Sequence, residues 1–191
     1  MVEFAVVFPV LVLLIVAVID VGHDWGDRVQ TTHAAREGAR SGSVGRVGTD
    51  GSCGIAGLPT DPTTADLVCL TKARTHMDPV DVRVRVTYMD GNGRYTSDFT
   101  VPTRRQNLYS ILVCVASRAS SLSGVLAPVF AGRFHHARSV IKTGTTPTYE
   151  VAPDGALIYD YVPPFEEQPF PDDPQGWTWC RSDDPSADVS P

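Results

Sequence analysis

Four cysteines are the residues with the clearest chemical use, and all of them follow an apolar N-terminal run: Cys53, Cys69, Cys114 and Cys180. No two of them form the C-x-x-C pair that is common in structural zinc sites, so the spacing gives little support to a metal centre. An even number of cysteines fits two disulfides in an oxidising compartment better. The alternative is four unrelated buried thiols. The spacing alone leaves three possible disulfide pairings open.

Other polar clusters lack the arrangement that binding or catalysis requires. Residues 90–93, Asp-Gly-Asn-Gly, faintly resemble a calcium loop, but the positions that follow lack its oxygen ligand, glycine and glutamate. A hairpin turn is the better interpretation. His135 and His136 are neighbours on an expected strand, so their side chains should point to opposite faces and not share a metal. No nucleophile elbow or phosphate-binding glycine loop is present. We therefore predict no catalytic residue, no metal site and no cofactor.

Composition narrows the classes of partner. The chain has 191 residues and a net charge of −6, without any block of basic residues. Nucleic-acid binding normally needs a basic stripe that neutralises phosphates, so we expect no nucleic-acid partner. Beyond the apolar run, roughly 150–170 residues remain, which is enough for one modest domain.

The apolar run from Phe4 to Ile19 indicates that the domain is attached to a membrane. With its flanking residues the run is about 20 residues long, and at about 1.5 Å per residue a helix of that length crosses one hydrocarbon core. A cleaved secretory signal is the alternative, but no basic residue precedes the run and no small-x-small cleavage pattern follows it. We expect a retained single-pass anchor. Arginines after the run would place the C-terminus inside by the positive-inside rule, whereas the cysteines favour an extracytoplasmic domain.

The segment that follows the anchor is expected to continue as a polar helix. Small residues recur in it at four-residue spacing, at Ala34, Gly38 and Gly42, with a second row at Ala35 and Ala39. Such rows allow two helices to approach closely. The alternative, which we weigh equally, is a solvated helix made of good helix formers.

The remaining chain predicts an α+β fold, with a small antiparallel sheet packed on a helix. Residues 80–88 alternate between apolar and polar side chains, which indicates a strand with one buried and one wet face. The other expected elements are a helix at 64–75, a return strand at 94–101, and strands at 108–116 and 133–142. From residue 143 the chain is rich in proline, and we expect it to lie across the sheet, with Trp177, Trp179 and Cys180 holding its end. The predicted organisation is a transmembrane helix at 1–22, its continuation at 23–42, a disulfide-bonded domain at 43–181 and a disordered tail at 182–191.

Several of these segments together resemble one family. The start, Met-Val-Glu-Phe-Ala-Val-Val-Phe-Pro at residues 1–9, precedes a long apolar run that ends at Asp20, and Ala-Ala-Arg-Glu-Gly-Ala-Arg follows at 34–40. This combination closely resembles TadE-like proteins, which are pseudopilins or minor pilins of the tight-adherence (Tad) type IV pilus machinery. The later half, including Cys114 and the Trp-x-Trp-Cys ending at 177–180, resembles actinobacterial members of the family.

The resemblance implies a non-enzymatic, pilin-like subunit that assembles through its hydrophobic helix and exposes a C-terminal domain at the cell surface. Its partners would be membrane lipid, other pilins and pilus-assembly membrane proteins, in a homo- or hetero-oligomer. A carboxylate at the edge of an apolar helix is costly unless it reaches the interface or a partner; in pilins the acid at the position of Glu3 neutralises a neighbour's terminal amine. The implied assembly residues are Glu3, Phe4, Pro9, Ala34, Gly38 and Gly42.

By the same resemblance, Cys53 pairs with Cys69 and Cys114 pairs with Cys180. The basic leader and the peptidase glycine of pilins are not present in this sequence. A membrane-anchored binding or display module that never enters a filament is the alternative function.

Overall fold

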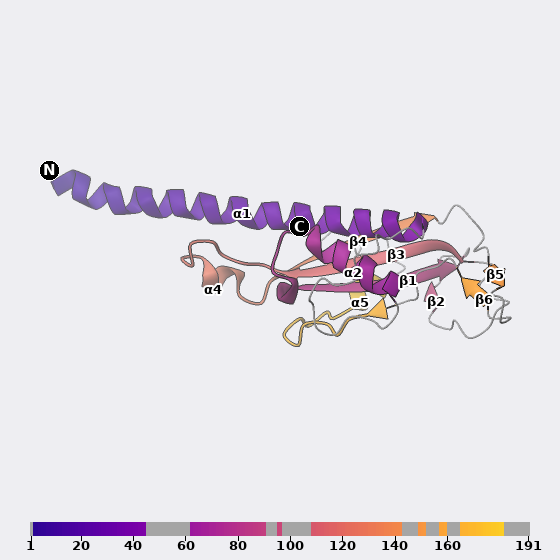
Figure 1. Cartoon of the computed structure of the whole chain (residues 1–191). Coiled ribbons are helices and arrows are strands. Elements are labelled where there is room, and N and C mark those ends of the chain that lie inside the picture. The colour runs from indigo at the N-terminus through magenta and orange to yellow at the C-terminus, as the bar shows by residue number, and fades with distance from the viewer. Residues whose placement is uncertain are drawn as a thin grey trace.

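The computed structural model of the chain describes residues 2–44, 62–90, 95–96, 108–142, 149–151, 157–159 and 165–181. Its longest element is the helix α1, Val2–Val44, in which the expected membrane helix and its continuation form one unbroken rod. Figure 1 shows the N-terminal half of α1 projecting beyond the folded domain, while the C-terminal half lies along the domain. One helix therefore serves two different environments.

The folded part is built on an antiparallel sheet, which confirms the predicted α+β class. Its strands are β1 Val82–Asp90, β2 Tyr95–Thr96, β3 Leu108–Arg118, β4 Phe134–Lys142 and β7 Phe165–Glu166. They lie in the order β2-β1-β3-β4, and β7 also pairs with β1. The long central strand β3 sets the register, because Val115 lies opposite Val84 on one side and Ala137 on the other. A separate hairpin joins β5, Tyr149–Val151, to β6, Leu157–Tyr159.

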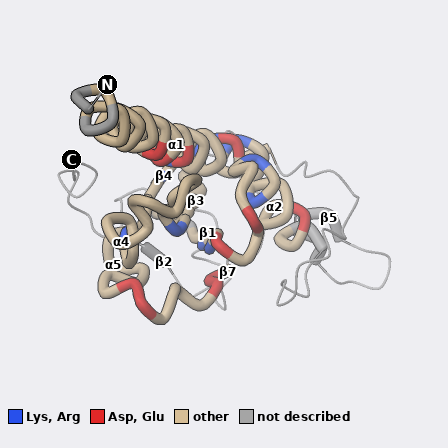
Figure 2. Tube along the Cα trace, turned by 90° about the vertical axis from the view of Figure 1, so that its left-hand side faces the viewer, with Lys and Arg blue, Asp and Glu red and all other residues tan. Residues whose placement is uncertain are grey.

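Two layers cover the two faces of the sheet (Figure 2). The helices α1 and α2, Pro62–Ala73, pack on one face, where Val84, Val113 and Val115 form the centre of the larger core. Residues 167–181, which follow β7, cover the opposite face, where Phe170 and Trp177 pack against residues of β3. This second layer contains the short helix α5, Thr178–Arg181.

The C-terminal layer corrects one expectation about β1. The apolar residues Val82, Val84 and Val86 are buried, as the alternating pattern predicted. Arg85 and Thr87 on the other face are also buried, each with 6% of its surface exposed, because the C-terminal layer lies over them. The face that was expected to be wet is therefore a second interface. Val80 was also expected in this strand but lies exposed in a 3-10 turn, Pro79–Asp81.

The remaining differences concern the ends of elements. Of the predicted return strand 94–101, the structure describes 95–96, which form β2. The hairpin of β5 and β6 was not predicted. Between β3 and β4 the chain forms a loop with one helical turn, α4, Ala127–Phe130. The predicted disordered tail, 182–191, lies outside the described residues.

Candidate functional site

The N-terminal half of α1 is an apolar surface that the rest of the chain leaves uncovered. Its large hydrophobic side chains are exposed on every side of the helix, among them Phe4, Phe8, Leu11, Leu14 and Val18. Residues 4–19 contain no acidic or basic side chain. The helix is long and apolar enough to cross a membrane, by length and composition. Because burying a side chain such as Leu or Phe is worth about 1.5–3 kcal/mol, this surface needs lipid or a partner.

Three of the residues implied in assembly lie at the start of this surface. Phe4 is 72% exposed, and its ring stacks on that of Phe8 at a centroid distance of 5.7 Å. Pro9 lies inside α1 without ending it, although its ring removes one backbone donor. Glu3 belongs to the same helix, but its side chain lies outside the described part of the structure.

Asp20 closes the apolar surface and fixes the helix to the domain. Its carboxylate is fully buried and accepts hydrogen bonds from the Ser121 hydroxyl at 2.8 Å, the Ser123 backbone N–H at 2.9 Å and the Ser123 hydroxyl at 2.6 Å. Hydrogen bonds to a charged acceptor are about twice as strong as neutral ones. Sequence reasoning missed this contact, although an acid ending an apolar run and a serine cluster far along the chain were both visible.

The contact at Asp20 begins a polar row along one side of α1. The row continues at helical spacing through Asp24, Asp27 and Thr31. Asp24 Oδ1 lies 2.9 Å from His135 Nε2, and the Thr31 hydroxyl lies 2.7 Å from that of Ser117. The middle of the helix is therefore attached to β3, β4 and their connecting loop by polar contacts rather than by apolar packing.

Beyond the polar row, the small residues that the sequence singled out lie against the chain's own domain. Ala34, Gly38 and Gly42 are all buried. A Cβ atom at Gly38 would come within 2.5 Å of the Thr71 hydroxyl of α2, and one at Gly42 would overlap the side chain of Ile111 of β3. The close approach expected of these residues thus takes place within the chain. They are covered here and do not form part of the exposed apolar surface.

Residues 1–40, which span the exposed apolar surface, the polar row and most of the small residues, match the family model of TadE-like proteins. The N-terminal helix is therefore similar to that of TadE-like proteins. TadE-like proteins belong to a pilus machinery, and the match suggests an association of this chain with the Tad pilus. A search of curated proteins and a search of solved structures found no match. The family match covers the helix and stops before the sheet.

The C-terminal layer of the domain is fixed by a disulfide. Cys114 of β3 is bonded to Cys180 of α5, with a Cα–Cα distance of 6.1 Å. This is the pairing that the resemblance implied. Cys69 is also disulfide-bonded, and its implied partner, Cys53, lies outside the described residues.

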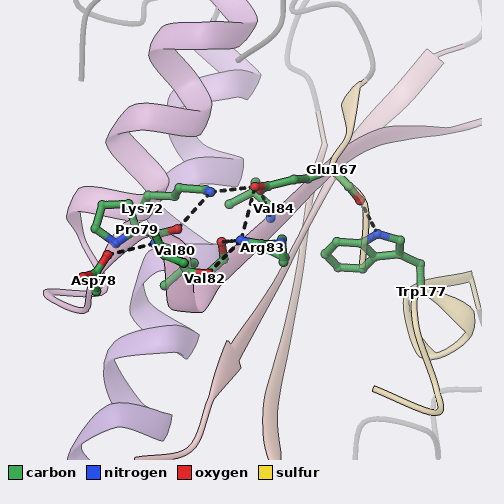
Figure 3. A network of polar contacts seen from close by, with 9 residues as sticks. All are labelled: Lys72, Asp78, Pro79, Val80, Val82, Arg83, Val84, Glu167 and Trp177. Atoms are coloured by element: carbon green, nitrogen blue, oxygen red, sulfur yellow. Dashed lines mark hydrogen bonds and ion pairs between the residues drawn. The ribbon is translucent and has the colours of Figure 1, made fainter. Parts of the chain in front are cut away.

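An ion pair between a buried lysine and a partly buried glutamate fixes the same layer at its other end (Figure 3). The Lys72 ammonium of α2 is 1% exposed, lies 2.8 Å from Glu167 Oε1 and donates to the Pro79 carbonyl. The second carboxylate oxygen, Glu167 Oε2, accepts from the Val84 N–H at 3.0 Å, while the Glu167 carbonyl accepts from Trp177 Nε1 at 2.7 Å. One residue thus connects the helical layer, the edge of the sheet and the C-terminal layer.

The neighbouring histidines do point to opposite faces, as predicted. His135 contacts Asp24 in the helical layer, while His136 Nε2 lies 3.1 Å from Asp173 Oδ2 in the C-terminal layer. Burial lowers the pKa of His136, and the hydrogen bond to Asp173 only partly opposes this shift. Each histidine therefore attaches β4 to one of its two covers.

A basic hollow of about 740 Å³ crosses the exposed side of the packed half of α1. Its lining includes three arginines and one acid, Arg36, Arg40, Arg74 and Glu37, together with His33 and His76. Across the described ranges, no group of three or more His, Cys, Asp or Glu side chains is placed to hold a metal ion. The exposed helix, rather than a pocket, is therefore the candidate functional site.

Proposed function

We propose that this TadE-like protein is a minor pilin or pseudopilin of the Tad machinery with no catalytic role. In this proposal residues 4–19 hold the chain in the membrane as a single pass. The same residues later pack against other pilins or pilus-assembly membrane proteins. The domain after Asp20 is exposed outside the cytoplasm, where the Cys114–Cys180 disulfide would persist.

The observation that carries this proposal is the division of α1 into an uncovered and a covered half. Leu11, Leu14 and Val18 are exposed, whereas Ala35 and Ala39 are completely buried by the domain of the same chain. A helix that only positioned the domain would need no projecting apolar half. A subunit that moves from lipid into a filament needs this surface in both places, since both environments bury apolar side chains.

Glu3 has a distinct place in the proposal. A carboxylate near the end of a lipid-embedded helix is costly until it meets a cation or the interface. We propose that Glu3 pairs with the terminal amine of a neighbouring subunit during assembly. Phe4 and Pro9 would contribute to the same helix–helix contact.

The test is mass spectrometry, without reduction, of sheared surface filaments and of the membrane fraction from the same cells. We expect the wild-type chain in both fractions, with its disulfides intact and one defined N-terminus. A Glu3→Gln variant should remain in the membrane and disappear from filaments. Glu37→Gln, an acid-to-amide change in the packed half of the same helix, is the matched control and should enter filaments normally.

A membrane-anchored display module is the second candidate, and the placement of the small residues favours it. Ala34, Gly38 and Gly42 are covered within the chain, so this part of α1 offers no small-residue face to a helix of another subunit. If the wild-type chain occurs only in membranes and never in filaments, the display module replaces the pilin.

A further inference from the structure

The loop between β3 and β4 exposes a second apolar surface close to the first. Leu122 is 65% exposed, and Val125 and Val129 are each 50% exposed. Residues 119–132 contain no charged side chain, and an arginine stands on either side of them, Arg118 and Arg133. Figure 1 shows this loop and α4 extending from the sheet toward the N-terminal end of α1, beside the helix.

The depth of this loop along α1 follows from the contacts at Asp20. Ser121 and Ser123 donate to its carboxylate, so the loop is held at the level of residue 20. The apolar run ends at residue 19, and a helix rises about 1.5 Å per residue. Leu122 and Val125 therefore lie at the level where the proposed membrane span ends.

The helix is also exposed and apolar at this level. Val18 and Ile19 are exposed just before Asp20, and Val21 and Trp25 are exposed just after it. Tryptophan is enriched where a membrane protein meets the lipid headgroups. The apolar surface of the loop therefore lies at the same level along α1 as the exposed apolar residues at the end of the span.

The backbone of the loop is suited to an apolar surrounding. Within α4 the Val129 N–H donates to the Leu126 carbonyl at 2.8 Å, and the Ala131 N–H donates to the Ala127 carbonyl at 2.9 Å. Polar backbone groups in contact with lipid must be satisfied internally, and these contacts do so for this turn.

From these observations we propose that the loop Ser121–Ala131 is a second membrane contact, seated in the interfacial zone of the bilayer. Leu122, Val125 and Val129 face the upper acyl chains, and Asp20 holds the loop at that depth. The proposal rests on the proposed membrane span. It makes the domain a body docked on the lipid surface rather than one carried on a stalk.

Site-specific labelling of the full-length protein in vesicles tests this contact. The three described cysteines are disulfide-bonded, so one engineered cysteine can be labelled with the polarity-sensitive fluorophore NBD, with unsubstituted protein as the labelling blank. Val125→Cys reports on the loop and Leu11→Cys on the span. Val140→Cys, on β4 and 44% exposed, is the matched control. The vesicles contain phosphatidylcholine and phosphatidylglycerol, with nitroxide-labelled lipids as quenchers.

We expect the emission of NBD at positions 11 and 125 to shift to the blue and to be quenched by the lipid nitroxides, with a shallow nitroxide more effective at 125. NBD at position 140 should behave as in water. If position 11 is quenched while 125 matches 140, the loop contact is wrong although the span stands. If position 11 is not quenched, the membrane span itself fails.

Two further outcomes show whether lipid or another subunit contacts the loop, and whether Asp20 sets its depth. A blue shift at position 125 that grows with protein density, without quenching by lipid, would mean that a neighbouring subunit covers the loop and would overturn the proposal. Adding Asp20→Ala, which removes the acceptor of all three hydrogen bonds, should reduce quenching at 125 severalfold and leave position 11 unchanged. Unchanged quenching at 125 would show that Asp20 does not set the depth of the loop.

Discussion

The two halves of α1 have opposite relations to the rest of the molecule. Residues 4–19 carry large apolar side chains that nothing in the described structure covers, whereas residues 34–42 carry small ones that are buried against α2 and β3. The size of the side chain accounts for the difference. Small residues let the helix axis approach the sheet, while leucine, valine and phenylalanine keep neighbours at a distance and present apolar area to lipid or another subunit. The comparison predicts that the two halves can be damaged independently.

The largest effect on the packed half should follow from removing the Cys114–Cys180 disulfide. The bond closes a loop with a sequence separation of 66 residues. By the chain-entropy relation, losing a loop of that size costs about 4 kcal/mol. The double variant Cys114→Ala/Cys180→Ala should lower the free energy of unfolding of the domain by this order in denaturant titrations. Its retention in membranes should equal that of the wild type. If the variant lost both domain stability and membrane retention, the two halves would not be independent.

The reciprocal change is Leu14→Asp in the uncovered half. Placing an aspartate where a leucine faces lipid costs about 3.5 kcal/mol near the centre of a membrane helix. We expect membrane retention to fall, measured by flotation of vesicle-bound protein, while the near-UV circular dichroism of the domain stays unchanged. Val44→Asp is the control, because Val44 is similarly exposed, at 65% against 62% for Leu14, but lies at the far end of α1.

A smaller effect is expected from enlarging one of the small residues. Gly38→Leu forces atoms against Thr71 and Val113 and should cost about 2 kcal/mol in unfolding free energy. Gly26→Leu is the control, because it makes the same substitution in the same helix at a position where a Cβ atom meets nothing within 4 Å. It should leave stability unchanged or raise it slightly through helix propensity. Equal destabilisation by both variants would contradict the close packing at Gly38.

The polar row between the halves should contribute less at each position. Thr31→Val leaves the buried Ser117 hydroxyl without the 2.7 Å contact and should cost about 1 kcal/mol. Thr32→Val is the neighbouring control, because its hydroxyl bonds only within the exposed surface of the same helix, to the Arg28 carbonyl. We expect its effect to be below about 0.5 kcal/mol. Thermal unfolding of the two variants side by side measures the difference.

The smallest effect concerns the other cover of the sheet, at His136. Because burial lowers the pKa of His136 in the folded protein, the unfolded chain binds a proton that the folded chain does not. Stability should therefore fall as the pH drops through the unfolded value of about 6.5, and level off below the folded pKa. His136→Gln should remove this part of the pH dependence, followed by denaturant midpoints between neutral and mildly acidic pH. His33→Gln, in the exposed hollow, should leave it in place.

Local patterns in the sequence determined much of this molecule. An unbroken apolar run is long enough to span lipid wherever the domain lies, alternation at Val82, Val84 and Val86 produces a strand, and adjacency alone sends His135 and His136 to opposite faces. The family pattern in residues 1–40 is equally local. None of these features depends on which segment lies opposite.

What only the tertiary structure decided is which partner each face meets. The polar face of β1 was expected in water but is covered by residues 167–181, because the Cys114–Cys180 bond and Glu167 hold that layer in place. In the row at Ala34, Gly38 and Gly42, the two glycines meet α2 and β3 of their own chain. Asp20 and Ser123 are 103 positions apart and form a hydrogen bond that no periodic pattern in the sequence predicts. Periodicity shows which residues share one face of a helix or strand. Which segment packs on that face depends on how distant parts of the chain fold together.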